Sequence, residues 1–143
     1  MYISFHSSVA IGILLLPLPL WVKVPLAILS HLVVDILGEH GLEKWRFKEF
    51  VLNGLLILGG ALFGKLGFAI SGIILGNLFD ILDMRKIKTG NIFTGWFKDV
   101  VIHKPNRFGK LFYPPVLVNL TEEQTFDCNK MVVILTIFIM FLL

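Results

Sequence analysis

Five stretches of the chain are predominantly apolar, and proline, glycine or charged residues separate them. Pro17 and Pro19 end the first stretch, and Pro25 is well placed for the first turn of the next helix. A long polar stretch, residues 84–130, precedes the fifth. The pattern predicts an all-α chain forming one domain, residues 1–143, with helices at about 7–21, 24–37, 50–63, 68–82 and 131–143.

The composition indicates a membrane environment. Hydrophobic residues make up 56% of the 143 residues and charged residues 16%, whereas soluble domains have about 45–50% and about 25%. The apolar stretches are shorter than the roughly 20 residues that a helix needs to cross a bilayer, but they span it where the bilayer thins. We therefore expect a polytopic integral membrane bundle of four to five short helices; hairpins that enter the bilayer part way are the alternative.

The basic residues predict how the bundle is oriented. The net charge is +3, and no Lys/Arg tract or aromatic-basic repeat indicates a nucleic-acid partner. With five spans, only Lys23 and Lys65 of the 13 lysines and arginines fall on the side of the turns at 22–24 and 64–67. Because basic loops are retained in the cytoplasm, we expect a cytoplasmic N-terminus, with the polar stretch 84–130 on the same side.

Ionisable residues in the apolar stretches mark the candidate site, because each costs about 2.5–3.5 kcal/mol at mid-membrane. His31 and Asp35 are four residues apart and share a helical face. At 1.5 Å per residue, His6, Asp35 and Asp80 lie about 21–23 Å from the predicted turns, and His31 lies one turn deeper. The sequence thus predicts that these four side chains meet at one level near the cytoplasmic face.

Two imidazoles and two carboxylates are ligands typical of Zn²⁺, and also of Mn²⁺ or Fe²⁺. Water bound to such a metal reaches a pKa near 7 and becomes a nucleophile. Because the site would open toward lipid headgroups, the nearest substrate is a phosphoester of a lipid or lipid-linked molecule. Asp83 is the predicted catalytic acid or base, with Glu39 and Glu43 as alternatives. His40 and His103, in or beside loops on that side, are additional candidate ligands.

Simpler interpretations stay open. His31 and Asp35 form either an ordinary hydrogen-bonded pair or a polar contact between helices, and Asp80 and Asp83 suit a solvated helix end. A non-enzymatic membrane subunit of a larger complex, or a homo-oligomer, would use the same cluster for packing. An ion-conducting protein fits less well, because the other half of these helices has no polar residues.

The polar stretch contains a predicted interfacial element. Residues 91–103 suit an amphipathic helix lying on the membrane surface. Basic residues there are positioned to contact anionic headgroups; these are Lys98, Lys104, Arg107 and Lys110. The element is either a cover over the bundle or a lid that docks anionic lipids. The segment 44–50, KWRFKEF, is interpreted as an interfacial anchor.

Two local motifs predict how helices begin and pack. Thr121, followed by two glutamates and Gln124, is typical of a helix cap leading to the fifth helix. G-x-x-x-G motifs at 60–64 and 72–76 favour close contact between helices.

Three segments resemble a known family. They read FHSSVAIGILL (5–15), SHLVVDILGEHG (30–41) and ISGIILGNLFDILD (70–83). They are similar to small bacterial and archaeal integral-membrane proteins known as membrane-bound metal-dependent hydrolases. That family is distantly similar to zinc-dependent phospholipase C and related nucleases.

The resemblance covers roughly residues 1–86 and implies a polar set by position. This set is His6, His31, Asp35 and Asp80, with His40 in the place of a second histidine. The resemblance also implies a location in a bacterial or archaeal cell membrane. Where the family usually has a Pro-Asp pair, this chain has Phe-Asp.

Overall fold

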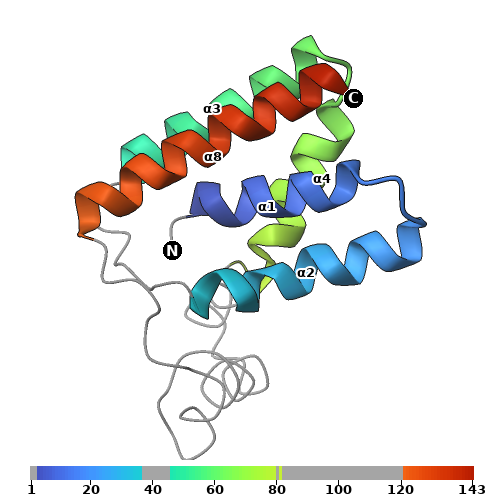
Figure 1. The fold of residues 1–143 in the computed structure, drawn as a ribbon, viewed down its shortest axis with the longest axis horizontal. Coiled ribbons are helices and arrows are strands. Elements are labelled where there is room, and N and C mark those ends of the chain that lie inside the picture. The colour runs from blue at the N-terminus through green and yellow to red at the C-terminus, as the bar shows by residue number, and fades with distance from the viewer. Residues whose placement is uncertain (1–2, 37–45, 80, 82–120) are drawn as a thin grey trace, which may run out of the picture.

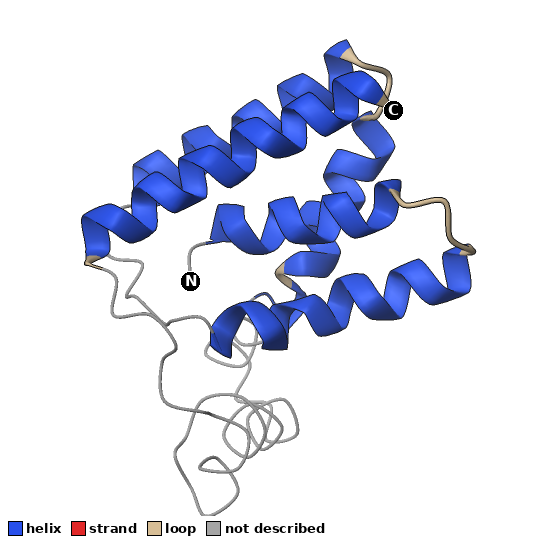
Figure 2. Cartoon of the chain, in the orientation of Figure 1, coloured by secondary structure: helices blue, strands red, loops and turns tan. Residues whose placement is uncertain are grey.

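The computed structural model describes residues 3–36, 46–79, 81 and 121–143 (Figures 1 and 2). Within these residues the chain forms five helices and no strand, which confirms the all-α prediction for this part of the chain. The helices are α1 (Ile3–Leu15), α2 (Leu20–Ile36), α3 (Arg46–Leu62), α4 (Leu66–Gly76) and α8 (Glu122–Leu142).

Prolines set the boundary between α1 and α2, and the prediction of a first helix at 7–21 is corrected to Ile3–Leu15. Pro17 and Pro19 have no N–H to donate into a helical ladder. The chain turns there, with the Leu16 amide donating to the Ile13 carbonyl at 3.2 Å. α2 begins at Leu20 instead of residue 24, so Pro25 lies inside the helix.

The turn between α3 and α4 depends on a glycine. Gly64 has φ +69°, a left-handed conformation that residues with a Cβ rarely adopt. The Lys65 amide donates to the Gly60 carbonyl at 2.6 Å, which closes the end of α3. α3 begins four residues before the predicted start at residue 50. α4 ends at Gly76, where Asn77 (φ −111°, ψ 18°) interrupts the helix. Residues 78, 79 and 81 are again helical, and the Ile81 amide donates to the Asn77 carbonyl at 2.9 Å, so the predicted helix to residue 82 is interrupted at Asn77.

The predicted cap of the last helix is confirmed. The Thr121 hydroxyl accepts from the Gln124 amide at 3.2 Å, and the Gln124 side-chain carbonyl accepts from the Thr121 amide at 2.9 Å. This capping box starts α8 at Glu122. Residues 122–130 are therefore helical, which corrects the predicted loop 84–130. Residues 84–120 lie outside the described residues.

The helices pack around α1, which contacts α2, α3, α4 and α8. α1, α3 and α8 begin, and α2 ends, at the left of Figure 1, while the turns 16–19 and 63–65 lie at the right. We call the end of the bundle at the left the polar end and the end at the right the turn end. Buried polar residues at the polar end include Ser4, His6, Ser7, Glu49, Thr125 and Asn129.

Glycines on α4 allow α1 to pack directly on its backbone. A Cβ on Gly76 would lie 2.6 Å from the His6 carbonyl oxygen and 2.9 Å from the Ala10 Cβ. A Cβ on Gly72 would lie 2.8 Å from the Ile11 amide nitrogen. The predicted close contact at 72–76 is therefore confirmed, and it places the end of α4 against the second turn of α1.

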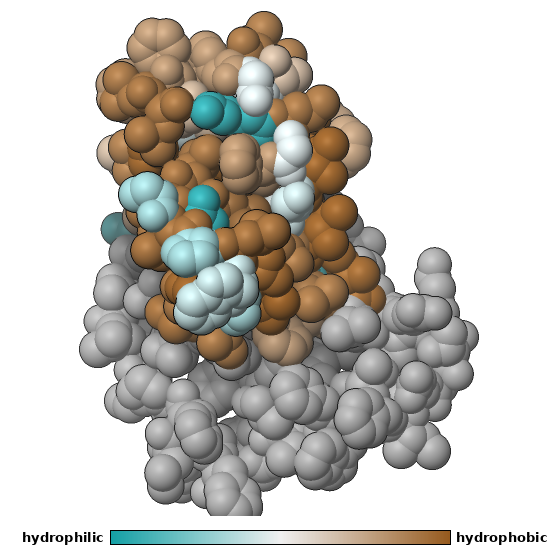
Figure 3. All heavy atoms as spheres, turned by 90° about the vertical axis from the view of Figure 1, so that its right-hand side faces the viewer, coloured by the Kyte–Doolittle hydropathy of each residue, from teal (hydrophilic) through white to brown (hydrophobic). Residues whose placement is uncertain are grey.

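Among the described residues, one helix is long and apolar enough to cross a membrane, namely α8 over Glu123–Leu142. The apolar segments Ile3–Leu15, Leu20–His31 and Leu66–Gly76 are shorter. The surface carries many apolar side chains, and the turn end is mostly hydrophobic with few hydrophilic residues (Figure 3). Trp21, for example, is 78% exposed and Leu20 is 67% exposed.

Candidate functional site

Two of the four predicted metal ligands lie against each other. The rings of His6 on α1 and His31 on α2 are stacked, with centroids 4.1 Å apart and planes 24° apart. Each side chain is 1% exposed. Two residues that are distant in sequence, and that the residue count places one turn apart in depth, are thus in contact.

The end of α4 orients this pair. The Gly76 carbonyl lies 2.7 Å from His31 Nδ1, and because a carbonyl only accepts, Nδ1 carries the hydrogen. The ring of Phe79 packs on His31 with centroids 5.4 Å apart. A backbone acceptor on one ring nitrogen is the usual support for a histidine that binds metal through the other. We call His6, His31 and the Gly76 carbonyl the histidine cluster.

The other predicted site residues are described only in part or not at all. Asp35 lies in α2 one turn after His31, and its side chain is outside what the structure describes. Beyond the described residues lie Asp80, Asp83, His40, His103, Glu39, Glu43, Lys98, Lys104, Arg107 and Lys110. Their roles stay predictions.

The imidazole nitrogens of His6 and His31 are suitable ligands for a divalent metal, but the stacked rings must rotate before both can bind one ion. Within the described ranges, no three His, Cys, Asp or Glu side chains are grouped for a metal ion. Two imidazoles on one tetrahedral Zn²⁺, with bonds near 2.0–2.1 Å, have centroids about 5 Å apart. The stacked rings are closer, at 4.1 Å. One ring must therefore turn before both nitrogens face a common ion.

A second buried polar group lies on the other side of α1. The Glu49 carboxylate on α3 accepts the Ser4 amide at 2.8 Å through Oε2. Its Oε1 lies 3.5 Å from Asn129 Nδ2 on α8. We call Ser4, Glu49 and Asn129 the carboxyl cluster, which joins α1, α3 and α8.

Glu49 is 2% exposed and lies one residue before the apolar stretch 50–63. Burial raises the pKa of its carboxyl above the ordinary value of 4.5, while hydrogen bonds from Ser4 and Asn129 and the charge of the N-terminus oppose that shift. The net result is a carboxyl group that holds its proton more tightly in the folded chain than in the unfolded chain.

Hydroxyl and amide groups connect the two clusters. Asn77 Nδ2, directly after Gly76, donates to Ser7 Oγ at 2.9 Å. Ser7 Oγ lies 2.7 Å from Asn53 Oδ1, and Asn53 Nδ2 donates to the Glu49 carbonyl at 3.0 Å. We call Ser7, Asn53 and Asn77 the polar link. It crosses from α4 through α1 to α3.

The sequence interpretation missed the carboxyl cluster. The segment KWRFKEF mixes aromatic and basic residues, so Glu49 was assigned to an interfacial anchor. A signal was present, because Glu49 and Asn53 share a helical face four residues apart, as do Thr125 and Asn129. Polar faces on separate helices tend to contact one another in an apolar bundle. The local sequence does not show which two faces pair.

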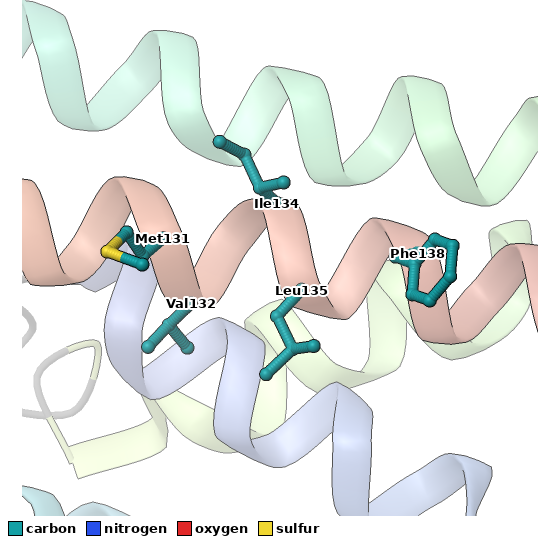
Figure 4. Close-up of a pocket in the computed structure, with 5 residues that line it drawn as sticks. All are labelled: Met131, Val132, Ile134, Leu135 and Phe138. Atoms are coloured by element: carbon teal, nitrogen blue, oxygen red, sulfur yellow. The ribbon is translucent and has the colours of Figure 1, made fainter.

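A shallow pocket of about 420 Å³ lies on the outer face of α8 (Figure 4). Five apolar side chains of that helix line it: Met131, Val132, Ile134, Leu135 and Phe138. It offers apolar contact and no group for acid–base or metal chemistry, so it is separate from both clusters.

Comparison with known proteins returned no matching family model, no matching curated protein and no matching solved structure.

Proposed function

We propose that the chain is an integral membrane protein whose polar end lies at the cytoplasmic face. α8 has the length and composition to cross the bilayer. α1 has 13 residues and α4 has 11, which at 1.5 Å per residue is about 20 Å and about 16 Å. These helices enter the bilayer part way or cross it where it is thin. The exposed apolar surface of the turn end supports this placement (Figure 3).

We propose that the polar end holds a divalent metal, Zn²⁺ first, and hydrolyses a phosphoester of a lipid or lipid-linked substrate. The observation that carries the proposal is the contact between His6 and His31, which brings two imidazoles from different helices to one buried place. His31 uses Nδ1 for the Gly76 carbonyl, which leaves Nε2 as its metal-facing nitrogen.

The remaining roles follow from the sequence. Asp35 and Asp80 would complete the ligand set. Asp83 would act as the acid or base that transfers a proton during hydrolysis. A metal held by these residues would supply a water of lowered pKa and a Lewis acid for the phosphoester. The protein's own contribution is to hold the imidazoles in an apolar bundle, since His6 and His31 are both buried.

Metal analysis of detergent-purified protein after loading with Zn²⁺, Mn²⁺ or Fe²⁺ tests this proposal. The wild type should retain about one metal ion per chain. His31→Ala and His6→Ala should lose it, while Glu123→Ala, an exposed carboxylate on α8, should retain it. A wild type that retains no metal would contradict the proposal, as would a His31→Ala variant that keeps its full content.

A second candidate function is a non-enzymatic membrane subunit. It is favoured by the polar link and the carboxyl cluster, whose hydrogen bonds join neighbouring helices as polar contacts do in membrane bundles. In that case a metal-free wild type should retain its thermal stability after chelator treatment, and it should co-purify with membrane partners or a second copy of itself.

A further inference from the structure

The carboxyl group of Glu49 is buried, and among the described residues it has no ion-pair partner. It is 2% exposed. A buried carboxylate without a paired charge is costly, and such groups usually shift their pKa and become neutral instead. The burial of Glu49 therefore favours its protonated form.

The hydrogen bonds of the cluster are incomplete at one place. Glu49 Oε2 has a good donor, the Ser4 amide at 2.8 Å. Glu49 Oε1 has only Asn129 Nδ2 at 3.5 Å, which exceeds the usual 2.7–3.2 Å. Asn129 is 0% exposed, and its Oδ1 has no hydrogen-bond partner among the described residues. Buried polar atoms of this kind are almost always paired.

A proton on Glu49 would pair Oε1 with the Asn129 oxygen, provided that the two side chains approach to the 2.5–3.0 Å of an O–H···O hydrogen bond. The oxygen and nitrogen of an asparagine amide are assigned from their hydrogen bonds, and turning the amide by half a rotation exchanges them. In Asn129 that rotation places Oδ1 opposite Glu49 Oε1. We propose that Glu49 is a proton-binding site, in which Oε1–H donates to Asn129 Oδ1 and fastens α3 to α8 beside the first turn of α1.

Among the neighbouring charged groups, the N-terminal ammonium lowers the pKa of Glu49, against the larger effect of burial. The titratable side chains described near this end of α1, α3 and α8 are His6, Lys48, Glu123, Asp127, Cys128 and Lys130. Lys130 binds Asp127 at 2.6 Å on the surface. Lys48 and Lys130 lie over the ring of Phe126, 5.1 Å and 5.3 Å from its centroid. The two lysines therefore converge on that ring and not on the carboxyl.

A proton held more tightly in the folded chain gives a defined dependence on pH. Its stabilising effect is complete below the unfolded pKa of about 4.5 and is lost as the pH rises through the raised folded pKa. The contact between α3 and α8 at the polar end should weaken over the same interval. This inference does not depend on a metal, so it stands or falls separately from the proposed hydrolase.

Thermal unfolding of the detergent-purified chain between about pH 4 and about pH 9 tests the site. Glu49→Gln keeps the shape and a donor for Asn129 but does not titrate. Its midpoint should match wild type at the acid end and exceed it by roughly 2–4 °C at the alkaline end. The matched control Glu123→Gln should follow the wild-type curve. Parallel curves for wild type and Glu49→Gln would overturn the proposal.

Infrared spectroscopy reads the proton directly. A protonated carboxyl has a carbonyl stretch distinct from that of a carboxylate, and wild type should show one that titrates above the ordinary glutamate range. The band should be lost in Glu49→Gln, retained in Glu123→Gln and shifted in Asn129→Leu, which removes the acceptor. If Glu49→Gln does not fold, Glu49→Asp should shift the band. A band unchanged by every substitution at Glu49 and Asn129 would contradict the assignment.

Discussion

The histidine cluster and the carboxyl cluster lie on different sides of the same helix, and they hold it by different chemistry. In the first, two imidazole rings stack between α1 and α2, and a carbonyl of α4 orients one of them. In the second, a carboxyl of α3 accepts the backbone amide of Ser4 in the first turn of α1 and lies against an amide side chain of α8. α1 supplies a residue to each.

This comparison explains why α1 has polar residues around its first two turns. Ser4 and Ser7 contact α3, while His6 contacts α2. Later in the helix, Ile11 and Leu14 are buried in apolar clusters. The bundle is thus joined by hydrogen bonds at the polar end and by apolar packing toward the turn end. Substitutions in each region test whether the two clusters are independent.

Gly76→Ala should have the largest effect, because it breaks the histidine cluster through the backbone. The new Cβ would lie 2.6 Å from the His6 carbonyl oxygen, so α1 and α4 must separate. We expect a loss of about 3 kcal/mol, at the upper end of overpacking costs. Thermal or chemical unfolding in detergent measures it.

The matched control is Gly12→Ala in α1, where a Cβ meets nothing within 4 Å. It should leave stability unchanged or raise it slightly, since alanine favours helix. If Gly76→Ala and Gly12→Ala have the same stability, the close backbone contact between α1 and α4 at Gly76 is contradicted.

Ser7→Ala tests whether the polar link couples the clusters. It removes the hydroxyl that accepts from Asn77 and lies 2.7 Å from Asn53. The buried amide of Asn77 and the half-buried amide of Asn53 then lose a partner, and we expect a cost of about 2 kcal/mol. Ser71→Ala, at an exposed position of α4, should change stability by less than about 0.5 kcal/mol.

A double-mutant cycle of Ser7→Ala with Glu49→Gln and with His31→Ala then sharpens the comparison. Coupling of about 0.5 kcal/mol or more with both partners would show that the link transmits between the clusters. Additive effects with both would show that it does not.

Thr121→Ala should lower the stability by a smaller amount, and the effect should be confined to the part of the bundle around the carboxyl cluster. It removes the side chain that accepts the Gln124 amide at the start of α8. Loss of such a cap costs about 1 kcal/mol. Hydrogen exchange should show faster opening of the first turn of α8 and unchanged protection of α2. Thr121→Ser, which keeps the hydroxyl, should restore wild-type protection.

Lys23→Met should have the smallest effect, at the opposite end from both clusters. Lys23 Nζ donates to the Leu14 carbonyl at 2.9 Å, near the negative end of the α1 dipole. We expect a loss of about 0.3–1 kcal/mol that decreases with added salt. Lys23→Arg should recover most of it. An effect as large as that of Ser7→Ala would contradict the view that hydrogen bonds matter most at the polar end.

Much of the local structure could be predicted from the sequence. Pro17 and Pro19 separate the first two helices, and Thr121 with Gln124 caps the last one, because these residues act on their own backbone. Helix ends were less predictable: α8 begins at Glu122 and α4 ends at Gly76. Polar residues inside a helix look like a loop when only hydropathy is read, as residues 122–130 show.

Short apolar helices could be predicted from the sequence, and so could the expectation that polar residues share one level, since the spacing of residues along a helix sets their height. The sequence also placed His6 and His31 near that level, because both heights follow from counting residues. Which helix faces meet depends on the tertiary fold. Glu49 is a buried carboxyl and not a surface anchor because α1 and α8 close over it. Rotation about a helix axis and the choice of neighbour depend on contacts between distant residues, and no local pattern records them.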